Sequence, residues 1–157
     1  MKIIYGVKVK LKSESTLLKL IGFIIKPFNP HFMSSYWTTI FTTVYAPSSF
    51  NINDEDVFID HKIVLEHEKI HIEDFKKYHI WYLFSYCLPY FRFIWERRAY
   101  ILELQQLCNN NEYDLFYWRL DRIVNALGGS EYFWSWHKPW IRKWFLKKLN
   151  MWDNEKL

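Results

Sequence analysis

Two histidines and a glutamate stand close together near the middle of the chain, as His67, Glu68 and His71. On a helix, residues four positions apart share one face, one turn from each other, so both imidazoles can bind one zinc ion at about 2.0 to 2.1 Å. Glu68 follows the first histidine directly, which brings its carboxylate beside a zinc-bound water whose proton it can accept. The pattern HExxH therefore predicts a zinc centre with Glu68 as its general base.

A catalytic zinc ion needs a third protein ligand and an open fourth position. The extended motif HExxHxxGxxH is absent, because Asp74 and Lys77 stand where it has its glycine and third histidine. Glu96 lies on the next predicted helix, and an antiparallel pair of helices would return it to the histidines. Glu103, two turns further along, is the alternative ligand, or it holds Glu96 in place. We expect Glu96 to be the third ligand.

Several other polar residues have possible roles around such a centre. Asp74 lies on the histidine face of the helix, where a carboxylate can hold the second nitrogen of an imidazole, although an ordinary solvated charge is the expected role. A donor to the oxyanion is also expected in this chemistry, and the sequence leaves three candidates open, namely Tyr100, Tyr132 and His137. The other histidines have no partner pattern, and we expect core or surface positions for His31, His61 and His79.

The elements that position these residues follow from the apolar pattern. Residues 3–12 alternate apolar and basic residues and predict a strand, and residues 36–45, rich in threonine, aromatic and β-branched residues, predict another. Residues 17–25 predict a short helix between them. Helical patterns dominate from residue 60 onward, with an active-site helix at 60–82 and later helices at 89–107, 114–127 and 139–149. Gly128-Gly129 predicts a left-handed cap at the end of the third of these helices.

Composition sets the class of protein. A chain of 157 residues suits a single domain, and an apolar share of 50% excludes a disordered chain. The net charge is +4, with a basic stretch at 138–148 that we interpret as a solvated amphipathic helix, so no nucleic-acid partner is expected. Cys87 and Cys108 form no CxxC pair and are expected to be buried, reduced thiols. Without a secretory signal or an apolar run long enough to span a bilayer, a cytoplasmic location is expected.

These residues together resemble a known family. HEKIH at 67–71, followed by WERRAY at 95–100, is similar to the gluzincin-type zinc metallopeptidases, in particular to small bacterial and phage zincin domains with HExxH and a later E-x-x-A-Y helix. The threonine-rich segment TTIFTTVYAP resembles their cleft-edge strand. Lys69 and Glu73 depart from the pattern, since the usual zincin helix has uncharged residues there.

The resemblance covers roughly residues 36–107 and implies both a fold and an activity. The implied fold is an α+β, zincin-like single domain, 1–157, mostly helical with a small N-terminal β-sheet. The implied activity is peptide or protein hydrolysis, with Zn²⁺ held by His67, His71 and Glu96 and with Glu68 activating the attacking water. The alternative is a catalytically inactive, zincin-derived module that binds a partner protein. Substrate, cleavage specificity and oligomeric state are not indicated by these motifs.

Overall fold

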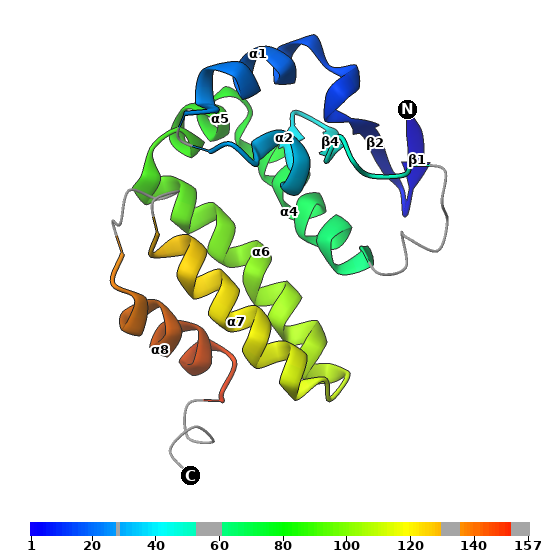
Figure 1. Cartoon of the computed structure of the whole chain (residues 1–157). Helices are drawn as coiled ribbons and strands as arrows, with labels where there is room; N and C mark the ends of the chain where they lie inside the picture. The colour runs from blue at the N-terminus through cyan, green and yellow to red at the C-terminus, as the bar shows by residue number, and fades with distance from the viewer. Residues whose placement is uncertain (28, 53–60, 130–135, 152–157) are drawn as a thin grey trace. The chain divides into compact units, whose positions relative to one another are not determined.

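The chain is α+β and mostly helical. The computed structural model describes residues 1–27, 29–52, 61–129 and 136–151 (Figure 1). These residues contain seven α-helices and one four-stranded sheet, which confirms the predicted class and the small N-terminal sheet. The chain divides into two compact units, Met1–His79 and Ile80–Leu157. That the whole chain forms one domain stays a prediction.

The first unit opens with a β-hairpin. β1 (Lys2–Ile4) pairs antiparallel with β2 (Val7–Leu11). Both residues of the turn have positive φ, 47° at Tyr5 and 77° at Gly6, and such a turn matches the right-handed twist of the two strands. The prediction of a single strand over 3–12 is therefore wrong, because the alternating pattern continues on both sides of this two-residue turn.

A second hairpin completes the sheet. β3 (Thr38–Ile40) pairs antiparallel with β4 (Thr43–Ala46), and β4 pairs parallel with β2. Phe41 has φ 56° between the two strands, so residues 36–45 form two short strands where one had been predicted. The strand order is β1-β2-β4-β3, which leaves β3 at an edge of the sheet.

Short helices connect the two hairpins. A 3-10 turn, η1 (Lys12–Glu14), follows β2 directly. α1 (Thr16–Ile25) comes next, and the Ser15 hydroxyl accepts from the backbone amide of Leu18 at its N-terminus, at 3.3 Å. α2 (Phe32–Ser35) precedes β3. The helix predicted over 17–25 is thus confirmed.

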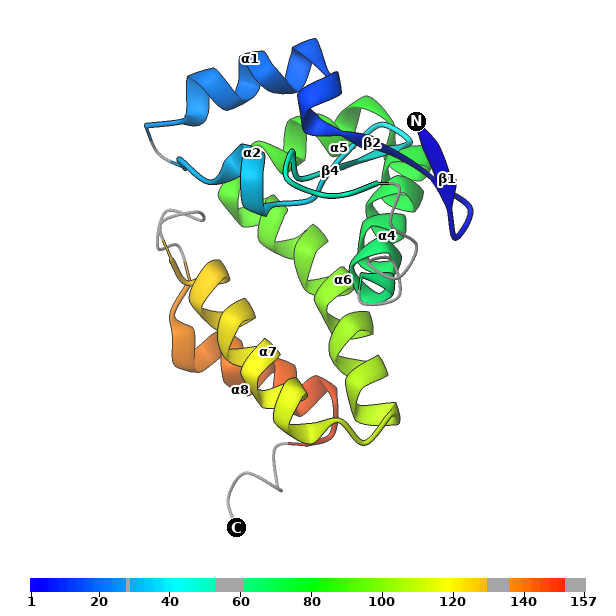
Figure 2. The same ribbon diagram turned by 45° about the vertical axis from the view of Figure 1, so that its right-hand side comes forward.

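α4 (Lys62–Tyr78) is the long helix of the first unit and carries the HExxH motif. It packs against β3 and β4 (Figures 1 and 2). His79, with φ 50°, ends the helix before the predicted residue 82, and the predicted first residue, Asp60, lies outside the described residues. Sheet and helix share one apolar core, formed by Ile4, Val7, Val9, Val44, Ala46, Leu65 and Ile72.

The second unit is helical. Its elements are α5 (Ile80–Tyr86), α6 (Pro89–Asn109), α7 (Tyr113–Leu127) and α8 (Lys138–Lys148). α6 packs against α5 and α7, and α7 packs against α8 (Figure 1). Proline at the start of α6 lacks the amide hydrogen that a first helical residue leaves unpaired anyway. The predicted helices 89–107, 114–127 and 139–149 are confirmed within two residues.

Three smaller expectations are decided by this unit. α8 buries Ile141, Phe145 and Leu146 and exposes most of its lysines, as predicted for an amphipathic helix. Gly128 has φ −95°, so the predicted left-handed cap at the end of α7 is wrong; the amide of Gly128 instead bonds to carbonyls of the last helical turn. Cys87 is exposed, which corrects its expected burial, because it lies in the turn between α5 and α6.

Within the residues that the structure describes, no helix has both the length and the apolar character needed to cross a bilayer.

Candidate metal centre

One face of α4 is polar and buried at once. His67, Glu68 and His71 expose 7%, 6% and 3% of their surface. Leu65 and Ile72, on the same helix, belong to the core beneath the sheet, and this packing holds α4 in register. Buried polar groups are costly unless they are paired or bind an ion, so the arrangement indicates a function beyond stability.

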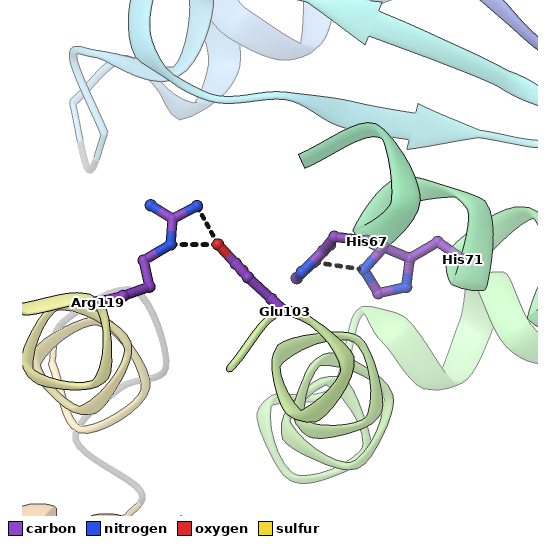
Figure 3. Close-up of polar contacts among 4 residues, drawn as sticks. All are labelled: His67, His71, Glu103 and Arg119. Carbon is purple, nitrogen blue, oxygen red and sulfur yellow. Dashed lines mark hydrogen bonds and ion pairs between the residues drawn. The ribbon is translucent and has the colours of Figure 1, made fainter. Parts of the chain in front are cut away.

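The two imidazoles face each other across one helical turn. The Nε2 atoms of His67 and His71 lie 3.2 Å apart (Figure 3). Two nitrogens that bind one tetrahedral zinc ion at about 2.0 to 2.1 Å are themselves separated by roughly 3.3 Å. The pair thus has the spacing of a two-nitrogen chelate. One protonated and one unprotonated imidazole would reach the same distance through a hydrogen bond.

Glu68 is oriented by the sheet edge. The hydroxyl of Thr39, on β3, donates to Oε2 of Glu68 at 2.6 Å. This bond ties the carboxylate of α4 to the edge strand against which α4 packs. Because the hydrogen bond fills one side of one oxygen, Glu68 keeps the capacity to accept a further proton.

A buried lysine begins the turn that follows strand β2. Lys12 is 0% exposed, and its Nζ donates to the carbonyl of Phe32 at 2.5 Å and lies 3.8 Å from the centre of the Phe32 ring. Burial lowers the pKa of Lys12 to about 8, and the charge of Glu68 opposes that shift. The sequence pattern missed Lys12, since alternation with Lys8 and Lys10 had placed it on the solvent side of a strand.

Glu96 occupies the expected helix. It lies on α6 of the second unit, is 6% exposed, and accepts a hydrogen bond at Oε1 from the hydroxyl of Tyr86 on α5. The indole of Trp95 donates to the Ser85 hydroxyl at 2.9 Å and fixes α5 against α6 beside this contact. Tyr86 was missed from the sequence, where it was one aromatic residue among many.

Glu103 has a different partner. Both Nε and a terminal nitrogen of Arg119, on α7, contact Oε1 of Glu103 (Figure 3). The carboxylate is only 3% exposed, so its charge is balanced within the second unit. This ion pair ties α6 to α7 and argues against the alternative in which Glu103 is a metal ligand.

His67, His71 and Glu96 are a group of three buried side chains that could hold a metal ion. Two imidazole nitrogens and one carboxylate oxygen are donors that zinc accepts, and three protein ligands are the number found at catalytic zinc sites. The ligand set expected from the sequence is thus chemically consistent with a metal centre.

The remaining candidates receive less support. Asp74 is buried at 2% exposure on α4, so the expectation of an ordinary solvated charge is wrong, and the alternative, a contact with a ligand histidine, stays a prediction. His61 packs against the rings of Trp37 and Phe50, and His79 against Phe75, as expected of histidines without a metal role. His31 is exposed.

The oxyanion donor stays open among the three residues that the sequence had left. Tyr100 is half-buried on α6, and His137 is exposed at the start of α8. Tyr132 lies outside the described residues.

No family model, no curated protein and no solved structure matches this chain.

Proposed function

We propose that the chain is a zinc-dependent, metallopeptidase-like hydrolase of the gluzincin type, with a zincin-like fold. The observation that carries this proposal is the 3.2 Å separation of the His67 and His71 Nε2 atoms on a buried helix face, next to the carboxylate of Glu68. Ligand spacing, burial and a neighbouring base are together what a hydrolytic zinc centre requires.

Glu96 is the proposed third ligand. It supplies the carboxylate to a group that could hold a metal ion, and the Tyr86 hydroxyl donates to its Oε1. Ligating carboxylates are commonly held by such hydrogen bonds, which orient the oxygen left for the metal. Since the histidines belong to the first unit and Glu96 to the second, the proposal requires the two units to act as one site.

Glu68 is the proposed general base. When bound, zinc would supply Lewis acidity that polarises a peptide carbonyl and makes water a stronger nucleophile. Glu68 accepts the proton of the attacking water and returns it to the leaving amine. The hydrogen bond from Thr39 holds the carboxylate at the sheet edge while it does so.

The edge strand β3 suits an extended substrate. β3 ends the strand order of the sheet, and its Thr39 contacts the proposed base. An extended peptide can pair with an edge strand through backbone hydrogen bonds, which bring a peptide bond toward groups beside that strand. Peptides and proteins are therefore the proposed substrate class.

Glu68→Gln is the sharpest test of catalysis. The amide has nearly the volume of the carboxylate and leaves both histidines in place, but it cannot accept the proton of water. Zinc-loaded wild type should cleave members of a fluorogenic degenerate peptide library, and Glu68→Gln should lose about 100- to 10,000-fold in kcat with unchanged zinc content. Glu73→Gln, at an exposed position of the same helix, is the matched control and should cleave like wild type.

Two results would redirect the proposal. Equal rates for wild type and Glu68→Gln would show that Glu68 is not the base. A zinc-loaded wild type that cleaves nothing would favour the inactive, zincin-derived binding module, in which the metal has a structural role.

A further inference from the structure

Helix α1 is apolar on almost every side, but the described part of the chain covers only one of them. Seven of its ten residues are leucine, isoleucine or phenylalanine, and the buried ones are Leu18 and Gly22, one turn apart. Met33 of α2 packs on that side, since a Cβ at Gly22 would lie 2.8 Å from its Sδ. A helix that is apolar all round ordinarily lies in a protein core or in a bilayer. The uncovered side of α1 therefore needs an occupant.

Four large apolar side chains lie on the uncovered side. They are Leu17, Leu20, Phe23 and Ile24, which expose 50%, 58%, 78% and 61% of their surface. Helical spacing places this group on the side away from Leu18 and Gly22, as one continuous apolar face. A single exposed apolar residue needs no explanation, whereas a continuous group of them marks a surface that binds something.

Positive charge borders this apolar face, and negative charge is missing from the surrounding sequence. Lys19 and Lys26 are exposed and, being seven positions apart, project from the same side of the helix. The two lysines and Asn29 line a groove of about 360 Å³ beside α1, which Phe32 and Met33 of α2 also line. Residues 15–53 contain no aspartate or glutamate. Ammonium groups along the border of an apolar face are complementary to an anionic surface with an apolar layer beneath it.

We propose that α1 binds an anionic lipid surface and lies flat on it, with its apolar face among the acyl chains and with Lys19 and Lys26 at the headgroup phosphates. Ten residues at 1.5 Å each extend about 15 Å, half of the roughly 30 Å hydrocarbon layer, so the helix lies along the interface and does not cross it. A second copy of the chain is a poorer occupant, because it would bring the same two lysines to the contact. The inference goes beyond the proposed hydrolysis and does not depend on it.

Sedimentation with lipid vesicles tests the proposal without zinc or hydrolysis. The full chain is kept in EDTA and mixed either with vesicles of phosphatidylcholine and phosphatidylglycerol or with vesicles of phosphatidylcholine alone. A lysine at an anionic surface contributes roughly fivefold in affinity, so wild type should bind the mixed vesicles about 30-fold more tightly than the neutral ones. Added salt should reduce this difference, because it screens the lysines from the phosphates.

Two double variants of α1 separate the charge from the apolar face. Lys19→Gln with Lys26→Gln should bind mixed vesicles about 30-fold more weakly than wild type and neutral vesicles like wild type. Phe23→Gln with Ile24→Gln should bind mixed vesicles more than about 100-fold more weakly, since both side chains then lose their transfer out of water. All four positions are exposed, so the circular dichroism spectra of both variants should match that of wild type.

Matched controls carry the same changes on other helices. Lys147→Gln with Lys148→Gln removes two exposed charges from α8, and Leu115→Gln with Trp118→Gln removes two apolar side chains, 44% and 53% exposed, from α7. Both controls should bind mixed vesicles like wild type.

Three results would overturn the proposal. Wild type that binds no mixed vesicles, or that binds mixed and neutral vesicles equally, would show that α1 does not recognise an anionic lipid surface. A control pair that loses as much affinity as its α1 counterpart would place the membrane contact elsewhere. Wild type that dimerises in sedimentation equilibrium without binding vesicles, while Phe23→Gln with Ile24→Gln stays monomeric, would assign the apolar face to a second copy of the chain.

Discussion

Glu96 and Glu103 form a matched pair for testing which carboxylate serves the metal. Both are buried, at 6% and 3% exposure, and both lie on α6. Their partners differ, because Glu96 accepts from the neutral Tyr86 hydroxyl whereas Glu103 is ion-paired with Arg119. Replacing each by glutamine changes the same charge on the same helix, so the two variants should fail in opposite ways.

Glu103→Gln should lower the stability of the fold and leave the affinity for zinc unchanged. A hydrogen bond to a charged group contributes about 1.5 to 3 kcal/mol and a neutral one about 0.5 to 1.5, so the loss is about 1 to 1.5 kcal/mol. Arg119 is 24% exposed, and the resulting screening keeps the loss at the lower end. For a chain of this size that is a decrease in Tm of roughly 2 to 6 °C, equal in EDTA and in excess zinc.

Glu96→Gln should leave the stability of the metal-free protein unchanged and lower its affinity for zinc. Loss of groups that merely support a ligand costs about 10- to 100-fold in metal affinity, so loss of the ligand charge should cost at least about 100-fold. At saturating zinc, a 100-fold weaker site forfeits about 2.7 kcal/mol of zinc-dependent stabilisation. The rise in Tm between EDTA and zinc should therefore shrink by roughly 5 to 11 °C.

Thermal unfolding of wild type and both variants, each in EDTA and in excess zinc, gives the comparison. If Glu103→Gln abolishes the zinc-dependent rise in Tm and Glu96→Gln preserves it, the wrong carboxylate has been chosen and the argument from their partners fails.

Three further outcomes are expected. Tyr86→Phe removes the hydroxyl that donates to Glu96, so zinc affinity, measured by competition with a chelator, should fall about 10- to 100-fold. The Tm of the metal-free variant should stay near that of metal-free wild type. Unchanged zinc affinity would show that Tyr86 does not orient Glu96. Thr39→Val removes the donor to Glu68, and kcat for peptide cleavage should fall at constant zinc content, whereas a change in KM alone would point to substrate binding. Burial lowers the pKa of Lys12 in the folded protein to about 8, below the value of 10.5 for the unfolded chain, so the contribution of Lys12 to the free energy of unfolding should increase as the pH rises from about 8 to 10.5. Urea denaturation of wild type and Lys12→Met over this pH range measures that contribution as the difference between their free energies of unfolding. A difference that does not change with pH would refute the lowered pKa.

Much of this architecture follows from local sequence. The helices α6 to α8 have strong apolar periodicity and clear limits such as Pro89, and their predicted bounds are close to those observed. The strands were harder, because Tyr5 and Phe41 adopt positive φ in turns without the asparagine or aspartate that usually signals such a turn. The pattern of alternation persists through these turns, and it therefore predicted two strands in place of four.

The candidate site shows the same division between local and distant information. His67, Glu68 and His71 lie within five consecutive residues, so helical geometry alone predicted their common face. Thr39 donates to Glu68 from 29 positions away. That contact depends on the antiparallel pairing of β3 with β4 and on the packing of α4 against both strands, which no local pattern encodes.

Zinc stoichiometry tests the central claim most directly. Protein purified without chelator, and the same protein stripped and titrated with zinc, should contain about one zinc ion per chain by elemental analysis. His71→Gln should bind far less, while the matched control His31→Gln, at an exposed position, should bind like wild type. A wild type that contains no zinc and takes up none on titration, or a His71→Gln variant that binds zinc as tightly as wild type, would contradict the account.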